Sequence, residues 1–186
     1  MSSGSSSPWT WLNEPARWEL TPTGLAFDVE PETDFWQVTH YGFVRDSGHF
    51  AALPSQGDFT LRVRFRGAFA EQYDQAGLMV RADAQEWVKC GIERVDGVDR
   101  MSVVVTRGAR SDWSLHPALG AGDGWYALEL RREADALHVS AVPDDGDPVA
   151  LRLAPLDRDA RVGAGVMAAA PTGRGFRVEF ADVALT

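Results

Sequence analysis

The chain has 186 residues, of which 45% are hydrophobic and 24% charged, close to the values of ordinary globular domains. This composition excludes a disordered, collagen-like or coiled-coil chain, and the formal net charge of −9 opposes binding to nucleic acid or to an anionic membrane. No apolar run approaches the roughly 20 residues that cross a bilayer, and the first residues do not resemble a signal peptide. We therefore expect a cytoplasmic protein with no nucleic acid and no membrane as partner.

The order of segments along the chain is that of an all-β protein. Residues 1–7 are rich in Ser and Gly and predict a flexible tail, and we expect a single domain over residues 8–186. The clearest strand covers 58–67, where apolar residues alternate strictly with Thr and Arg. A single helical turn is expected at 69–73 and a loop at 111–118. Further strands are expected at 24–29, 49–53, 76–81, 87–95, 101–107, 125–132, 137–143, 149–153, 162–168 and 176–185.

Short strands at this spacing, separated by Gly, Pro and Asp, are typical of two stacked antiparallel sheets. The fold class predicted from the residues is therefore all-β, a two-sheet antiparallel β-sandwich. The arginines at positions 62, 64 and 66 then form the solvated outer face of one strand.

Neither the cysteine nor the histidines predict a reactive or metal-binding site. Cys90, the only cysteine, alternates with Val88 and Ile92 on the expected buried side of a strand, which predicts an inert core thiol. The four histidines have no spacing typical of zinc ligands. We expect no metal, no cofactor and no catalytic residue.

One strand face carries the residues that indicate a function. Trp87, Lys89 and Glu93 alternate along the segment 87–97 and point the same way. If this segment pairs with 73–83 as a hairpin, Gln75 shares the face, while the glycines at 77 and 91 leave room on it. Polar groups and aromatics around a hollow are typical of small-ligand sites, including sugar sites.

Other residues are expected at the rim of this face. Asp112 and Trp113 follow the strand that should pair with 87–95, and Trp36 lies in a stretch without periodicity that can close the opposite side. His49 precedes an apolar strand. The candidate ligand-binding residues are Trp36, His49, Gln75, Trp87, Lys89, Glu93, Asp112 and Trp113.

Several motifs carry a family resemblance. DFW, YGF and DSGHF within residues 34–50, followed by YDQAGLMVR, WVKCGIE and RGARSDWS, resemble the regulation-of-enolase-like family, domain of unknown function 1349. The resemblance covers nearly the whole chain and implies a concanavalin-A-like jelly roll of the lectin and glucanase superfamily. In related sandwiches the concave face binds carbohydrate. The resemblance implies no reaction.

The sequence is compatible with three functions. The first is a non-catalytic domain that binds a carbohydrate or another small polar ligand on the concave face. The second is a glycoside hydrolase or lyase that acts through Glu93 with Asp112 or His49, although the alternating acidic triplet of glucanases on this fold is absent. The third is a protein-interaction module that regulates a metabolic enzyme. If this strand face has no binding role, we expect Lys89 and Glu93 to form a surface ion pair and the tryptophans to belong to the core.

Overall fold

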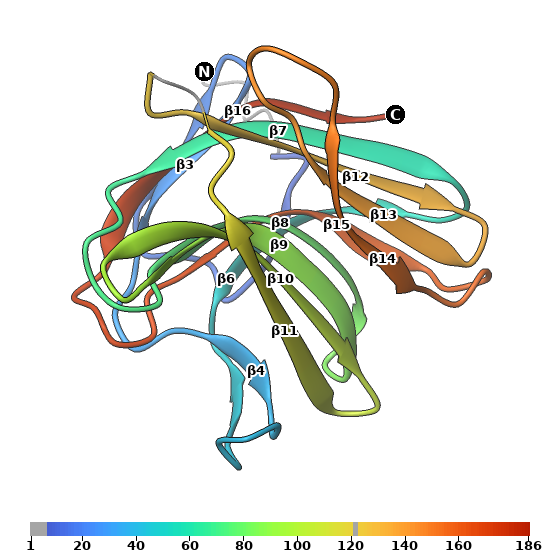
Figure 1. The fold of residues 1–186 in the computed structure, drawn as a ribbon, viewed down its shortest axis with the longest axis horizontal. Coiled ribbons are helices and arrows are strands. Elements are labelled where there is room, and N and C mark those ends of the chain that lie inside the picture. The colour runs from blue at the N-terminus through green and yellow to red at the C-terminus, as the bar shows by residue number, and fades with distance from the viewer. Residues whose placement is uncertain (1–6, 121–122) are drawn as a thin grey trace, which may run out of the picture.

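A computed structural model describes residues 7–120 and 123–186, and every regular element in these residues is a β-strand. Two antiparallel sheets of seven strands are stacked on each other, as Figure 1 shows. Sheet A contains, in spatial order, β1 (Thr10–Leu12), β6 (His49–Ser55), β15 (Val162–Ala169), β8 (Gln75–Asp83), β9 (Glu86–Val95), β10 (Val98–Arg107) and β11 (Arg110–Pro117). Sheet B contains β14 (Val149–Pro155), β13 (Ala136–Ala141), β12 (Tyr126–Glu133), β7 (Phe59–Gly67), β16 (Phe176–Leu185), β3 (Gly24–Val29) and β2 (Trp18–Thr21). The predicted all-β sandwich is confirmed.

Strand β7 shows how the alternating sequence produces the layers. Its apolar side chains are buried between the sheets, whereas the three arginines of the strand point outward. Arg62 pairs with Glu129 at 2.7 Å and Arg66 pairs with Glu179 at 2.7 Å, both across neighbouring strands. Trp125 lies beside this row, with its ring 4.6 Å from the Arg66 guanidinium carbon. The interpretation of this row as a solvated outer face is confirmed.

The main hydrophobic core fills the space between the two sheets. It contains the inward-facing residues of both sheets, among them Phe27, Phe65 and Phe180, and it includes Cys90. Burial raises the pKa of the Cys90 thiol to about 12, so the thiolate does not form at neutral pH. The predicted core thiol is confirmed.

The sequence did not predict five of the strands, namely β1, β2, β4, β5 and β11. The loop expected at 111–118 is wrong, because β11 pairs with β10 from Arg110 to Pro117. The sequence of β11 shows no alternation of apolar and polar residues, because the buried position 111 carries a polar side chain. The Ser111 hydroxyl is hydrogen-bonded to Thr106 at 2.7 Å. The helical turn expected at 69–73 is also wrong, because the Asp74 carboxylate accepts from the backbone N–H groups of Ala70 and Glu71 and shapes a turn there. Of the predicted tail at 1–7, only Ser7 lies among the described residues.

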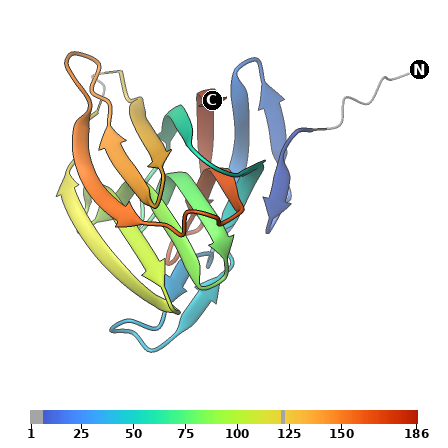
Figure 2. The same cartoon turned by 90° about the vertical axis from the view of Figure 1, so that its right-hand side faces the viewer.

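A short hairpin of β4 (Phe35–Gln37) and β5 (Val44–Asp46) lies on the face of sheet A that points away from sheet B. In Figure 1 the strands of sheet A arch over this hairpin, and Figure 2 shows it from the side at the same lower end of the molecule. Phe35 and Trp36 pack against the outer face of sheet A and form a second, smaller hydrophobic core there. That core contains Phe35, Trp36, Phe50, Ala52, Met79, Trp87, Val104 and Met167. The hairpin therefore covers only part of the curved face.

Two opposed glycines let the central strands of sheet A approach closely. Gly77 and Gly91 face each other across β8 and β9. A Cβ atom on Gly77 would lie 2.0 Å from the Cys90 carbonyl oxygen, and one on Gly91 would lie 1.9 Å from the Ala76 carbonyl oxygen. Neither position accepts a side chain without separating the strands.

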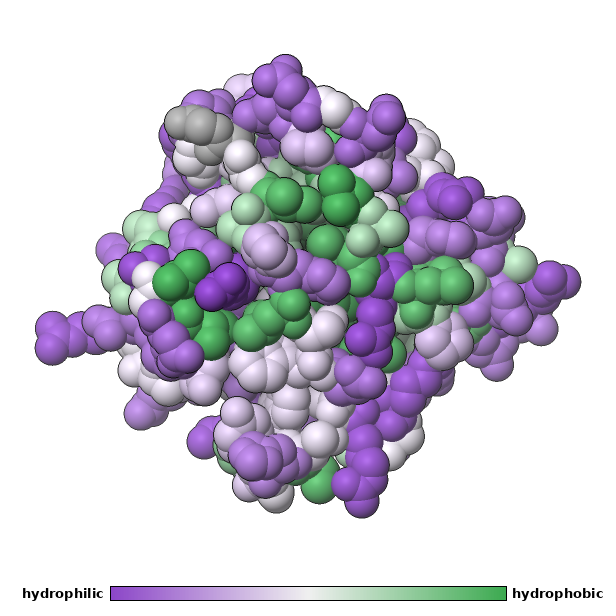
Figure 3. Space-filling model, in the orientation of Figure 1, coloured by the Kyte–Doolittle hydropathy of each residue, from purple (hydrophilic) through white to green (hydrophobic). Residues whose placement is uncertain are grey.

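The outer surface matches this layered core. On the face shown in Figure 3, hydrophilic side chains dominate the margin and hydrophobic ones gather nearer the centre. Within residues 7–120 and 123–186, no helix has the length and apolar character needed to span a membrane.

Candidate ligand pocket

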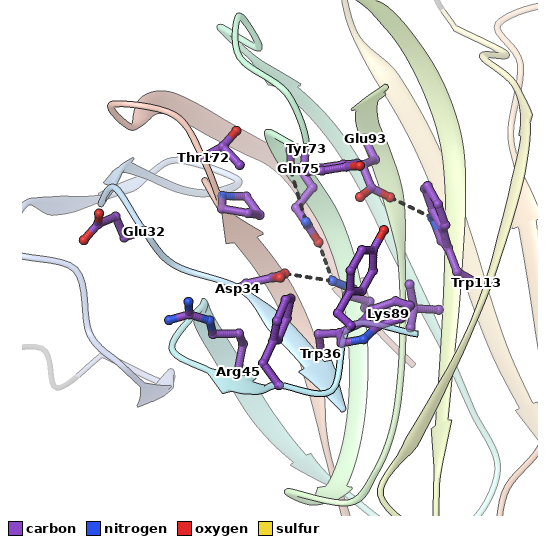
Figure 4. Close-up of a pocket in the computed structure, with 14 residues that line it drawn as sticks. Glu32, Asp34, Trp36, Arg45, Tyr73, Gln75, Lys89, Glu93, Trp113 and Thr172 are labelled. Carbon is purple, nitrogen blue, oxygen red and sulfur yellow. Dashed lines mark hydrogen bonds and ion pairs between the residues drawn. The ribbon is translucent and has the colours of Figure 1, made fainter. Parts of the chain in front are cut away.

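A pocket of about 380 Å³ lies between the β4–β5 hairpin and the part of sheet A that the hairpin leaves uncovered. Figure 4 shows its polar groups, most of which come from the strands of sheet A and from the segment before β4, whereas Arg45 comes from β5. Acidic, basic and aromatic side chains all contribute to it. The lining residues are Glu32, Asp34, Trp36, Tyr41, Phe43, Arg45, Tyr73, Gln75, Lys89, Glu93, Val104, Trp113, Pro171 and Thr172.

Lys89, the only lysine of the sequence, forms the floor of the pocket. Its ammonium group donates to the Phe35 carbonyl oxygen at 2.9 Å and to Gln75 Oε1 at 2.5 Å, and it lies 3.6 Å from Asp34 Oδ1. A compact ammonium group with three hydrogens suits three separate acceptors better than a planar guanidinium does. Because Phe35 belongs to β4 and Gln75 to β8, the lysine ties the hairpin to sheet A.

Glu93 lies on the same strand face and is also buried. Its Oε2 atom accepts from the Ser102 hydroxyl at 2.6 Å and from the Trp113 indole N–H at 2.9 Å. Burial raises the pKa of the Glu93 carboxyl group, although the positive charge of Lys89 and these hydrogen bonds act in the opposite direction. The interpretation of Lys89 and Glu93 as a surface ion pair is wrong, because each is buried and bonded to other groups.

Aromatic side chains form two sides of the pocket. On the hairpin side, Tyr41 stacks on Phe43 with ring centroids 5.4 Å apart and meets Trp36 edge to face at 5.6 Å. On the sheet side, Tyr73 meets Trp113 edge to face at 6.4 Å. Tyr41 and Phe43 are partly exposed, at 47% and 39%, so their rings are available at the mouth of the pocket.

The turn that carries Tyr41 has an unusual backbone. Val38, His40 and Gly42 all have positive φ angles, of 54°, 65° and 75°. A β-branched residue in this region is strained, and such strain is kept where the surrounding structure holds it. Tyr73 has a positive φ of 67° as well. Left-handed residues thus occur in both segments that bring a tyrosine to the pocket.

Five of the eight predicted site residues line the pocket. They are Trp36, Gln75, Lys89, Glu93 and Trp113. The hairpin pairing that places Gln75 opposite Glu93 is confirmed by the register of β8 and β9. Trp36 lies in the strand β4 and not in a loop.

The other three predicted residues, Trp87, His49 and Asp112, lie elsewhere. Trp87 is buried beneath the hairpin, where its indole N–H donates to the Ala84 carbonyl oxygen at 3.2 Å. The His49 ring contacts Phe27 in the main core, and its nitrogens are bonded to the Asn13 carbonyl oxygen and the Glu30 backbone N–H.

Asp112 and Glu93 project from opposite faces of sheet A. Asp112 is the cross-strand partner of Val105, which belongs to the core between the sheets, whereas Glu93 belongs to the pocket face. The Asp112 carboxylate pairs instead with Arg152 of sheet B at 3.0 Å. The structure therefore does not bring Glu93 together with Asp112 or with His49.

The sequence reasoning missed several lining residues, of which Asp34, Tyr41, Phe43 and Tyr73 are the most prominent. All four belong to the motifs DFW, YGF and YDQAGLMVR, which carry the family resemblance. These motifs could have indicated the four residues, although the residues themselves show no alternation typical of a strand. Among residues 7–120 and 123–186, no group of three or more Asp, Glu, His or Cys side chains is arranged to hold a metal ion.

Two stacked seven-stranded sheets, with an aromatic-walled pocket on the outer face of one of them, define a jelly-roll β-sandwich with a candidate ligand site. The chain belongs to the family described as protein of unknown function (DUF1349), whose model matches residues 11–186. It is 39% identical over 178 residues to Regulation of enolase protein 1 of Saccharomyces cerevisiae, an alignment that covers 95% of this chain and 88% of that protein. The predicted family is confirmed.

Solved structures agree with the fold. A functionally unknown protein from Saccharomyces cerevisiae superposes with a TM-score of 0.90 at 37% identity, covering 96% of both chains. The carbohydrate-binding module CBM66 from Bacillus subtilis superposes with a TM-score of 0.61 at 14% identity, covering 97% of this chain and 96% of that one. At this low identity the second likeness concerns the fold alone.

Proposed function

We propose that this protein binds a carbohydrate or another small polar ligand in the pocket above Lys89 and does not catalyse a reaction on it. The observation that carries the proposal is the combination of two aromatic sides with a buried polar floor in a cavity of about 380 Å³. Aromatic rings stack on the CH face of a sugar, while a few fixed polar groups bond its hydroxyls. The likeness in fold to a carbohydrate-binding module supports the same ligand class.

A catalytic function through Glu93 has little support. The partners considered from the sequence, Asp112 and His49, do not reach the pocket, and His49 is held by two backbone groups. Glycoside hydrolysis needs a second carboxylate placed across the scissile bond. The Asp34 carboxylate, which also lines the pocket, lies beside the Lys89 ammonium and accepts from the Phe35 backbone N–H at 2.8 Å. We infer that it orders the floor.

The test is a titration followed by tryptophan fluorescence and by ligand-observed NMR, with a panel of neutral mono- and oligosaccharides. Tyr41→Ala removes a ring at the mouth of the pocket and should weaken binding about two- to tenfold, because a stacking aromatic contributes about 0.5 to 1.5 kcal/mol. Trp125→Ala is the matched control, since Trp125 packs on Arg66 of sheet B, and should leave binding unchanged. Absence of binding to every saccharide would contradict the carbohydrate proposal.

A second candidate function is regulation of a metabolic enzyme through direct contact. The name of the yeast relative describes regulation of enolase, and the hairpin presents Tyr41, Phe43 and Val44 as exposed apolar side chains at its tip. This function would place the protein in the cytoplasm. Calorimetric titration of purified enolase into the wild-type protein and into Val44→Asp tests it. Binding that the substitution abolishes supports this function, whereas absence of heat with the wild type contradicts it.

A further inference from the structure

The ammonium group at the floor of the pocket is buried, donates two hydrogen bonds within the protein and forms an ion pair with Asp34, so it offers little to a ligand. Lys89 directs its ammonium group at the Phe35 carbonyl oxygen, at Gln75 Oε1 and at Asp34 Oδ1, and its side chain is only 4% exposed. Figure 4 shows the contacts to Gln75 and Asp34 as dashed lines. A phosphate or carboxylate that bonded to Lys89 would displace one of these acceptors. Leaving a buried acceptor unpaired costs about 1 to 3 kcal/mol.

The carboxyl oxygen atoms that remain available inside the pocket are hydrogen-bond acceptors. Among residues 7–120 and 123–186, Glu93 Oε1 and Asp34 Oδ2 take part in no hydrogen bond, whereas the other oxygen of each carboxyl group is bonded. In Figure 4 the Glu93 carboxyl group extends from β9 toward the space above Lys89. A ligand that donates hydrogen bonds satisfies these atoms, and an anionic ligand is repelled by them.

Arg45 does not alter this balance. It is exposed at the rim, with its guanidinium carbon 5.4 Å from the centre of the Phe43 ring. Figure 4 shows its guanidinium group turned away from Lys89. Solvent and salt screen a charge in that position, so Arg45 contributes little attraction to an anion inside the pocket.

An anionic ligand therefore meets two obstacles, because it would have to displace an acceptor of Lys89 and would lie close to the carboxyl groups of Glu93 and Asp34. An uncharged ring with several hydroxyl groups meets neither obstacle. Its hydroxyls can donate to Glu93 and Asp34, and its CH face can stack on the rings of Tyr41 or Trp113.

We infer that the pocket selects uncharged sugars and rejects the corresponding sugar acids and sugar phosphates. This inference rests on the proposed function and names the class of sugar that it concerns.

The experiment measures affinities for matched pairs by calorimetry and ligand-observed NMR at neutral pH and physiological salt. The pairs are glucose with glucuronate and with glucose 6-phosphate, galactose with galacturonate, and fructose with fructose 6-phosphate. We expect at least one neutral sugar to bind. Its anionic counterpart should bind with an affinity lower by about tenfold or more. Equal or tighter binding of the anion overturns the inference but leaves the proposed function in place. Binding of no compound in this set overturns the inference and counts against the carbohydrate part of the proposed function.

Glu93→Gln tests whether this carboxylate carries the discrimination. The amide can keep its oxygen toward Ser102 and Trp113 while it presents an NH₂ group to the cavity, so one acceptor becomes a donor. We expect the preference for the neutral sugar to fall about fivefold or more. Glu129→Gln, which changes a carboxylate on the outer face of sheet B, is the matched control and should leave the preference unchanged. An unchanged preference in Glu93→Gln, in a variant shown by circular dichroism to be folded, contradicts the inference.

Discussion

Replacing Lys89 by Met tests whether one buried side chain fastens the β4–β5 hairpin to sheet A. The substitution keeps an unbranched side chain of similar length but removes the donor to the Phe35 carbonyl oxygen and to Gln75 Oε1. Each acceptor left buried costs about 1 to 3 kcal/mol. Burial of the apolar methionine offsets about 1 to 2 kcal/mol of that cost.

The expected result is a loss of about 2 to 3 kcal/mol in the free energy of unfolding. For a chain of this size, that loss lowers the melting temperature by roughly 5 to 10 °C. Urea unfolding followed by tryptophan fluorescence measures it. Because the hairpin should loosen first, limited proteolysis should cut Lys89→Met between residues 38 and 44 earlier than it cuts the wild type.

Arg66→Met is the matched control, since it removes a cation from an exposed pair with Glu179 on sheet B. It should change stability by about 1 kcal/mol or less. If Lys89→Met proves as stable as the wild type, or more stable, the desolvation cost of the ammonium group outweighs its hydrogen bonds, and the reasoning about its fastening role is refuted.

Three further predictions concern other parts of sheet A. Gly91→Ala should destabilise the fold by about 3 kcal/mol, because its Cβ would meet the Ala76 carbonyl oxygen, whereas Gly97→Ala, in an open turn, should cost about 1 kcal/mol in urea unfolding. The raised pKa of Glu93 means that the folded state binds its proton more tightly than the unfolded state, so the stability due to this group falls as pH rises from about 4 through the folded-state value. The free energy of unfolding of the wild type, relative to that of Glu93→Gln, should therefore decrease as pH rises over this range. A difference between the two proteins that does not change with pH would contradict this prediction. Because the pKa of Cys90 is raised to about 12, Ellman's reagent should react with it only after unfolding, and rapid reaction of the native protein would show that β9 opens.

The sequence by itself determined the layers. Alternation in the segment 58–67 predicted both the buried side of β7 and its row of outward arginines, because a strand exposes every second residue to each face. The same rule, together with the expected hairpin pairing, placed Gln75, Lys89 and Glu93 on one face, and the register of β8 and β9 agrees with it. Local periodicity was sufficient in these cases, since each strand is long enough to repeat its pattern several times.

Only the tertiary structure decided what covers that face. The segment from Asp34 to Asp46 has short strands and left-handed residues, so it carries no period, and nothing local shows that it folds back onto sheet A. That contact buries Trp87, which the strand pattern places beside Lys89, and leaves a pocket next to it. The role of Asp112 likewise depends on Arg152, which lies far along the chain on the other sheet. Contacts between distant segments decide whether a polar face is a groove, a pocket or a core, and alternation along one strand contains no information about them.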